Sequence, residues 1–362
     1  MCVVEALPPS GGTYMSVTIY DVARRAGVGI GTVSRAINDS DLIAPQTKER
    51  VLAVARELGY RPHASARGLA RKKTNTIGVI VPFFTGYFFV ELLRGIQQAV
   101  SEYQYDLILY SVDEINKKDT FLGKTLEQRK VDGVLLISLE ISDTDAQKFL
   151  QSQLPIVLVD SYHPKLDSIT VENRQGAYVA TQHLIRLGHK KIGMIDGHLK
   201  SSPARVRLEG YKGALEDYHI EFNEEYLIVS DFISGEDGFN QEAGYEAMSR
   251  LLNSDNDYPT GLFISSDIQA VGAMKAVREK GLSIPDDIAI VGFDDIELAQ
   301  YVGLTTMRQP MFEMGKLAVD RLFNRISGER TNGFKTTFRT DLVIRESCGA
   351  LKNGRIDVET PL

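Results

Sequence analysis

Thr-Ile-Tyr-Asp-Val-Ala-Arg-Arg-Ala-Gly-Val-Gly-Ile-Gly-Thr-Val-Ser-Arg-Ala-Ile-Asn, residues 18–38, is the stretch that decides how this chain begins to fold. Thr18 stands three residues before Asp21, which is the spacing of a capping box, so a helix is predicted to begin there. The apolar stripe of this helix has helical spacing and consists of Val22, Ala23 and Ala26. Gly27 predicts its end, because glycine readily adopts the left-handed conformation of a helix C-terminus.

A second helix is predicted from about residue 29 to residue 37, with Val33 and Ile37 facing inward. Its outward side chains would be Thr32, Ser34 and Arg35. Two short helices joined by a tight glycine turn form a helix-turn-helix, which places its second helix in the DNA major groove. The alternative, a helical hairpin that only packs, is disfavoured by the residues that follow.

A third helix opens at Ala44-Pro45-Gln46-Thr47, and Pro62 marks its stop by disfavouring helical geometry at the residue before it. Its buried face would be Val51, Val54, Ala55 and Leu58. Together with residues 18–38, this segment resembles the DNA-binding headpiece of the lactose-repressor family of bacterial regulators. Residues 64–70 resemble the hinge helix of that family, and Leu69 stands where the family wedges a leucine into the minor groove. The resemblance spans Val17 to Ile344.

The resemblance implies roles for the outward residues of the headpiece. Phosphate contacts are implied for Tyr20, Thr32, Ser34 and Asn38. Arg35 is implied as the base reader. Ile30 and Gly31 depart from the family pattern, because they occupy positions that usually carry operator-specifying side chains, often polar. Ile30 can touch a thymine methyl group and Gly31 has no side chain to read with, so no relative's operator sequence can be carried over.

Composition places the chain among proteins with two or three compact units, since it has 362 residues and is 43% hydrophobic. No apolar run is long enough for a membrane span, and no secretory signal opens the chain, so no membrane association is expected. The only cysteines are Cys2 and Cys348, which favours a reducing cytoplasm. The family resemblance implies a bacterial protein located at the nucleoid. A P-loop, a nucleophile elbow and a metal-spaced His/Cys pair are absent from the sequence, so no enzyme, cofactor or metal is expected.

The net charge of −7 is unevenly distributed along the chain. Residues 15–76 hold eleven Lys and Arg against five Asp and Glu, whereas the rest of the chain is acidic. A basic head on an acidic body is typical of a protein that meets nucleic-acid phosphates with one end. Residues 1–14 are expected to be a disordered tail, or Met15 to be the true start.

From residue 76 onward, short apolar strands alternate with amphipathic helices. Strands are predicted at 77–81, 107–110, 133–137, 156–159, 191–195, 262–264 and 288–292. Helices are predicted at 91–103, 175–187, 268–280 and, by the family resemblance, at 309–326 in the first lobe. Continuous apolar strands suit parallel sheets that are covered by helices on both faces. The predicted fold is therefore an all-α headpiece and hinge helix joined to an α/β body of two doubly wound lobes, as in periplasmic binding proteins.

The predicted domains are a DNA-binding domain at 15–62, a hinge and linker at 63–75, an effector-binding and dimerisation domain at 76–348, and a polar tail at 349–362. Lobe 1 is predicted at about 76–172 plus 306–335, and lobe 2 at about 173–304 plus 336–348. The tail has no apolar heptads, so the tetramer-forming coiled coil of some relatives is not expected and a homodimer is predicted.

Candidate effector-binding residues recur at the ends of the predicted strands, where doubly wound sheets bind ligands. They are Phe88, Phe89, Asp160, Arg207, Phe232, Ser266, Asp294 and Gln309. Phe88, Phe89, Arg207, Phe232 and Asp294 match positions at which the family lines its pocket or binds ligand, whereas Asp295 is interpreted as a structural group.

Carboxylates, arginine and aromatic rings together favour a sugar or sugar phosphate as the effector. A purine is the alternative, because it too would stack on Phe88 and Phe232. Purine-responsive relatives carry an additional arginine where Ser201 stands, and its absence favours a sugar. The resemblance implies a regulator of operator DNA, most simply a repressor, and a protein corepressor is a further alternative. The sequence is compatible with an effector that releases DNA and with one that promotes DNA binding.

Overall fold

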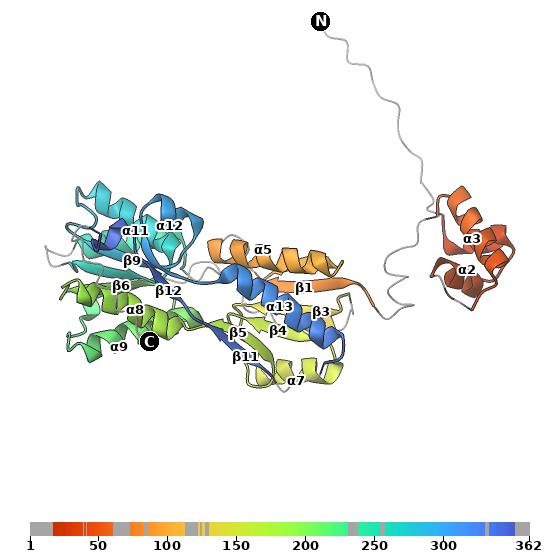
Figure 1. Cartoon of the computed structure of the whole chain (residues 1–362), viewed down its shortest axis with the longest axis horizontal. Coiled ribbons are helices and arrows are strands. Elements are labelled where there is room, and N and C mark those ends of the chain that lie inside the picture. The colour runs from red at the N-terminus through yellow and green to blue at the C-terminus, as the bar shows by residue number, and fades with distance from the viewer. Residues whose placement is uncertain are drawn as a thin grey trace, which may run out of the picture. The chain divides into compact units, whose positions relative to one another are not determined.

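The computed structural model describes residues 17–38, 40, 42–60, 73–82, 86–112, 122–123, 125–126, 130–230, 238–253, 258–329 and 333–351. The chain divides into two compact units, residues 1–74 and residues 75–362 (Figure 1). The first contains the headpiece and the second contains the body. The predicted N-terminal tail, the hinge segment 64–70 with Leu69, the position Phe232 and residues 352–362 lie outside the described residues.

The headpiece contains three helices, α1 (Ile19–Ala26), α2 (Ile30–Ile37) and α3 (Pro45–Glu57). Thr18 begins α1 as predicted, because its backbone N–H and its hydroxyl donate to Asp21 Oδ2 at 3.0 and 2.6 Å. Gly27 ends α1 with a φ of +64°. The three helices share a small core of Val22, Ala23, Ala26, Val33, Ala36, Val51 and Ala55. The predicted helix-turn-helix is confirmed.

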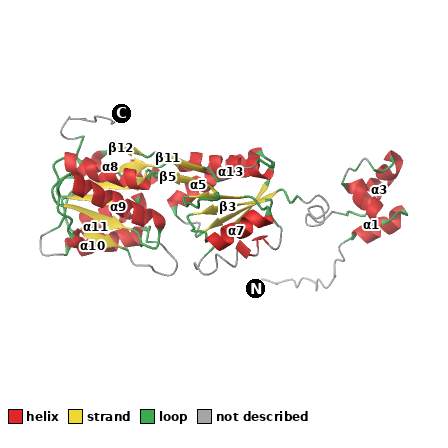
Figure 2. Ribbon diagram, turned by 90° about the horizontal axis from the view of Figure 1, so that it is seen from below, coloured by secondary structure: helices red, strands yellow, loops and turns green. Residues whose placement is uncertain are grey.

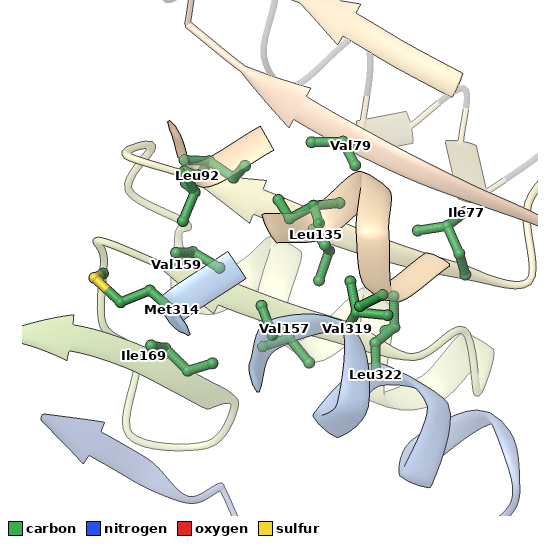
Figure 3. Packing of buried hydrophobic residues seen from close by; sticks show 14 of the residues in the cluster. Ile77, Val79, Leu92, Leu135, Val157, Val159, Ile169, Met314, Val319 and Leu322 are labelled. Carbon is green, nitrogen blue, oxygen red and sulfur yellow. The ribbon is translucent and has the colours of Figure 1, made fainter. Parts of the chain in front are cut away.

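Lobe 1 of the body is built on a parallel six-stranded sheet in the order β11-β5-β4-β3-β1-β2. Its strands are β1 (Thr76–Val81), β2 (Asp106–Ser111), β3 (Gly133–Ile137), β4 (Ile156–Val159), β5 (Asp167–Val171) and β11 (Lys335–Phe338). Helices α5 (Tyr87–Glu102) and α13 (Met311–Ile326) cover one face, and α7 (Asp143–Ser152) covers the other. Figure 3 shows the first of these contacts, where Leu92 of α5 and Val319 of α13 pack over Leu135 and Val157.

Lobe 2 is built on a second six-stranded sheet in the order β12-β10-β9-β8-β6-β7. Its strands are β6 (Ile192–Asp196), β7 (Leu227–Val229), β8 (Gly261–Ile264), β9 (Ala289–Asp294), β10 (Thr305–Arg308) and the antiparallel β12 (Asp341–Val343). Helices α8 (Asn173–Arg186) and α9 (Ser202–Asp217) pack on one face, and α10 (Gln241–Leu252) and α11 (Asp267–Glu279) pack on the other (Figure 2). Three short helices complete the lobe, η1 (Glu224–Tyr226), α12 (Glu297–Tyr301) and η2 (Glu346–Cys348). The two doubly wound lobes confirm the predicted fold class.

The chain passes between the lobes at three places: after β5, between β10 and α13, and between β11 and β12. The predicted lobe-1 helix near the end of the chain is confirmed as α13. The lobe boundaries predicted at residues 306 and 336 were wrong by a few residues. Thr305–Arg308 pairs with β9 and therefore belongs to lobe 2, while Lys335–Phe338 pairs with β5 in lobe 1.

One predicted helix also began too late. The helix predicted at 91–103 begins at Tyr87, so Phe88 and Phe89 belong to the first turn of α5 and not to a loop. Gly86 precedes this turn with extended backbone angles, which lets the helix start directly after the loop. Among the described residues, no helix is both long and apolar enough to cross a membrane.

Candidate functional site

A pocket with an empty volume of about 980 Å³, including its part open to solvent, lies between the two lobes. Residues that follow the carboxyl ends of strands in both sheets line it, which is where ligands bind in doubly wound sheets. Lobe 1 contributes Pro82, Gly86, Tyr87, Phe88, Phe89, Ser138, Leu139 and Asp160. Lobe 2 contributes His198, Lys200, Ser201, Pro203, Arg207, Phe239, Ser266, Ile268, Asp294 and Ile296.

The structure brings six of the eight predicted effector residues into this one pocket, namely Phe88, Phe89, Asp160, Arg207, Ser266 and Asp294. Gln309 does not line the pocket but lies behind it, with its side-chain Nε2 donating to Asp294 Oδ1 at 2.5 Å. Phe232 is outside the described residues. The contacts of these residues with an effector stay a prediction.

Arg207 projects from the second turn of α9, and its guanidinium is almost completely buried. Its Nε donates to Asn173 Oδ1 at 2.8 Å, and its Nη1 donates to the carbonyl oxygen of Ser265. The guanidinium carbon lies 3.8 Å from the centroid of the Phe293 ring. Nη2 lies 3.9 Å from Asp294 Oδ1, which is within ion-pair range but too long for a hydrogen bond. The buried arginine is therefore held in place while Nη2 retains donor capacity toward the pocket.

Two carboxyl groups face Arg207 from opposite lobes. Asp160 follows β4 with a φ of +54°, and Ser138 donates to its Oδ2 at 2.8 Å. Burial raises the pKa of Asp160 to about 6, while Ser138 and Arg207 act to lower it. Asp294 ends β9, and burial likewise raises its pKa to about 6 against the lowering effects of Arg207 and Gln309. Both carboxyl groups are therefore about half-protonated near pH 6.

Aromatic rings form the apolar wall of the pocket. Phe88 and Phe89 pack edge to face, with ring centroids 5.3 Å apart. Phe239, which the sequence analysis missed, lies just before the N-terminus of α10. Its ring packs against Gly197, where an added Cβ would lie only 2.5 Å from the ring. A sequence reading gave little signal for Phe239, since a single phenylalanine in a polar loop has no periodicity to place it.

Other polar residues of the pocket were also missed, namely Ser138, His198 and Lys200, whereas Ser201 was named only as the position of an arginine in purine-responsive relatives. The interpretation of Asp295 as a structural group agrees with its contacts, because its carboxylate joins Arg308 and Arg345 at 2.6 Å each. Within the residues that the structure describes, no group of three or more His, Cys, Asp or Glu is placed to hold a metal ion.

The residues implied as DNA contacts lie on α1, on α2 and directly after α2. Tyr20, Ile30, Gly31 and Arg35 are exposed, whereas Thr32, Ser34 and Asn38 are half-buried. Asn38 Nδ2 donates to Ser34 Oγ at 3.4 Å, so these two side chains are held together. An added Cβ at Gly31 would meet only Arg35 Nη2, at 3.6 Å, so this position has room for a side chain.

Comparisons with known proteins bear on both units. Residues 18–63 match the bacterial regulatory proteins of the lacI family, and residues 181–348 match a periplasmic binding protein-like domain. The chain is 38% identical to the ribose operon repressor of Haemophilus influenzae over 92% of this chain and 99% of that protein. It is 35% identical to the transcriptional repressor PurR of the same species, over 91% of this chain and 98% of that protein.

Solved structures agree with this assignment. The lac repressor dimer bound to operator and the anti-inducer ONPF superposes with a TM-score of 0.76, at 28% identity over 92% of this chain and 99% of that one. The complex of the transcriptional regulator CelR with cellobiose gives 0.68, at 31% identity over 91% and 99% of the two chains. The chain therefore belongs to the LacI family, as a DNA-binding transcriptional repressor with a periplasmic-binding-protein-like effector domain, and is not an enzyme.

Proposed function

We propose that this repressor is controlled by a sugar or sugar phosphate that binds between the lobes. The observation that carries the proposal is the placement of Asp160 and Asp294 on opposite lobes, with Arg207 beside Asp294. A sugar hydroxyl both donates and accepts hydrogen bonds, so it can satisfy a carboxylate and an arginine at once. A ligand with several hydroxyls would join the two lobes through these groups.

The apolar wall supports the same class of ligand. Phe88, Phe89 and Phe239 offer ring faces and edges to the C–H surface of a sugar ring, while Ser138 and Ser266 add hydroxyl groups. The relatives agree in part, since one is a ribose operon repressor and one solved structure is a complex with cellobiose. A purine effector stays the alternative, because rings of this kind also stack on a base.

The proposed action on DNA follows from the headpiece. Two copies of the chain would pair through their bodies and present two α2 helices to a near-palindromic operator. Tyr20, Thr32, Ser34 and Asn38 would contact phosphates, Arg35 would read a base, and Leu69 would wedge into the minor groove between them. Effector binding would change operator affinity only as far as the effector prefers one arrangement of the lobes over the other.

The test is a thermal-shift screen of the full chain against sugars, sugar phosphates and purines, with D-ribose as the first probe. A ligand present at 100 times its dissociation constant stabilises the folded state by roughly 2.7 kcal/mol, which shifts the melting temperature measurably. A sugar that stabilises wild type but not Asp294→Asn supports the proposal. Asp167→Asn is the control, because Asp167 is buried at the opposite end of the lobe-1 sheet. Stabilisation by purines alone, or by no member of the panel, would refute the sugar class and favour the purine or a protein corepressor.

A further inference from the structure

A second buried carboxyl group of lobe 2 lies behind the pocket wall and does not line the pocket. Asp196 is the last residue of β6, and it is completely inaccessible to solvent. Its Oδ1 accepts hydrogen bonds from Ser265 Oγ at 2.6 Å and from the backbone N–H of Gly197 at 2.8 Å. Its Oδ2 is buried and has no hydrogen-bond partner among the residues that the structure describes. A buried carboxyl oxygen without a partner is unfavourable, so the position calls for an explanation in terms of function.

Ser265 connects Asp196 to the pocket. Its hydroxyl donates to Asp196, while its carbonyl oxygen accepts from Nη1 of Arg207. Asp196 and Ser265 are both fully buried. Ser265 follows β8, the strand that pairs with β6. The Asp196 carboxyl group therefore orients a residue whose main chain holds the buried arginine.

The hydrogen bonds around Asp196 and Ser265 continue through Gln269 to two further elements of the pocket. Gln269 Nε2 donates to the carbonyl oxygen of Gly238, directly before Phe239, at 2.9 Å. Its Oε1 accepts from the hydroxyl of Ser266 at 3.0 Å. The hydroxyl of Ser230 donates to the Asp196 carbonyl oxygen at 2.9 Å. A connected polar network thus supports the arginine, the serine and the aromatic ring that lobe 2 turns toward the pocket.

We propose that Asp196 is a positioning residue for effector recognition, which fixes Arg207 in the pocket through Ser265. The inference rests on the proposed function only in taking Arg207 as an effector contact. Nothing about Asp196 requires direct contact with the ligand, because the pocket lining does not include it. A hydrophobic residue would fill the same volume without an unpartnered oxygen, so the hydrogen bond to Ser265 is the feature that the carboxyl group adds.

The charge state of Asp196 gives this link a signature of its own. Burial raises the pKa of Asp196 to about 7, while Ser265, Gly197 and the positive charge of Arg207 lower it. Arg207 is also faced by Asp160 and Asp294, whose pKa values lie near 6. Titration of Asp196 should therefore reach Arg207 in addition to the titrations of these two groups.

The test compares Asp196→Asn and Asp196→Ala in the full-length protein without ligand, by NMR of the Nη1–H group of Arg207, which donates to the carbonyl oxygen of Ser265. In wild type this signal should exchange slowly and titrate with a component near pH 7. Asparagine keeps the acceptor oxygen for Ser265, so Asp196→Asn should retain slow exchange and lose that component. Asp196→Ala should exchange about tenfold faster, because the turn at Ser265 loses its acceptor. Asp167→Asn serves as the control, since it alters a buried, ion-paired carboxylate of lobe 1 and should leave the signal unchanged.

Ser265→Ala provides a second route if Asp196→Ala does not fold, because it removes the hydroxyl donor and keeps the carbonyl group. It should accelerate the exchange of the Arg207 signal as Asp196→Ala does. The proposal would be overturned if the Arg207 signal is unchanged in both Asp196→Ala and Ser265→Ala. If Asp196→Ala does not fold, an unchanged signal in Ser265→Ala alone would overturn it. Persistence of the component near pH 7 in Asp196→Asn would overturn it as well.

Calorimetric titration with D-ribose forms the second arm. Asp196→Ala should weaken binding about tenfold, and Asp196→Asn should stay within about twofold of wild type at pH 6. If wild type does not bind D-ribose while the Arg207 signal responds to Asp196→Ala, the positioning role is supported and only the choice of sugar fails. If D-ribose binds equally well to wild type and Asp196→Ala, the positioning role is overturned and the proposed function stands.

Discussion

Asp294→Asn should make the ligand-free protein more stable at neutral pH while weakening its effector affinity. Asp294 is 6% exposed, and burial raises the pKa of its carboxyl group from 3.8 to about 6. Folding therefore opposes its ionisation. Asparagine keeps the oxygen that accepts from Gln309 and tolerates the φ of +125° at this position better than most residues, so the charge is the main property removed.

The magnitude follows from proton linkage. Because the folded state holds its proton up to about pH 6 and the unfolded state only to 3.8, stability falls as pH rises through this window. A difference of about two pKa units corresponds to roughly 3 kcal/mol, which is the upper limit of the gain above pH 7. At pH 5 about half of this penalty applies. Asp294 also offsets the charge of Arg207, so the observed gain should be smaller than the limit.

The assay is urea unfolding of wild type and Asp294→Asn at pH 5.0 and pH 7.5 without ligand. The expected result is a stability difference in favour of the variant that is larger at pH 7.5. The pKa of Asp267 is raised by burial and by the charge of Asp294. Removal of that charge should therefore also favour ionised Asp267 and add to the gain in stability. A variant that is less stable by the same amount at both pH values would refute the reasoning, because the charge would then carry no folding penalty.

Three further predictions concern other parts of the chain. Glu140→Gln should raise the rate of effector dissociation about two- to fivefold, because it breaks an ion pair that joins the lobes, with Arg205 Nη2 2.7 Å away. The effect is small because partly exposed ion pairs contribute at most about 1 kcal/mol. Gly95→Ala should lower stability by about 3 kcal/mol in thermal unfolding, since its Cβ would clash with the carbonyl oxygen of Phe312 on α13. Gly31→Ala should stabilise the headpiece by about 0.5–1 kcal/mol in a melt of the full chain.

Each of these predictions has a matched control. Glu279→Gln neutralises an ion-paired carboxylate within α11 and should leave the dissociation rate unchanged; equal rates for it and Glu140→Gln would contradict the interlobe role. Gly213→Ala adds a methyl group to α9 with no contact shorter than 3.9 Å and should not destabilise, and an equal loss at both glycines would rule out the clash. A headpiece weakened by Gly31→Ala would show that the backbone of α2 requires glycine there.

The interior strands could be predicted because their residues are continuously apolar. Val134 and Leu158, for example, lie in strands that helices cover on both faces, and no turn residue interrupts either run. The strands that were not predicted lack this pattern. β10 buries Thr305 and Thr306, which become compatible with the interior only through hydrogen bonds to Arg345, Ser347 and Asp267. These partners lie far apart in the sequence, so no local pattern reveals the strand.

The edge strands escaped prediction for a different reason. β7, β11 and β12 are short and partly exposed, so their side chains need not be apolar. The shift of the lobe boundaries follows from both omissions, since the interior strand β10 and the edge strand β11 define them.

Part of the pocket was predictable from residue type and strand ends together. Asp160 and Asp294 each follow a strand that was recognised from its apolar residues, and parallel strands bring such ends to one edge. Phe239 and Lys200 lie in loops, whose path depends on packing such as that of the Phe239 ring on Gly197. The effector contact of Gln309 stays a prediction; in this structure Gln309 does not line the pocket and instead donates to Asp294.

The position of Gln309 also indicates how the pocket can act on the arrangement of the lobes. Gln309 lies at the crossover from β10 of lobe 2 to α13 of lobe 1, and both its backbone N–H and its side chain donate to Asp294. An effector hydroxyl that donates to Asp294 shares this carboxylate with Gln309. We infer that ligand occupancy bears directly on the crossover that begins α13. Because α13 packs closely on α5, whose first turn lines the pocket, a shift at this crossover must be accommodated by both helices.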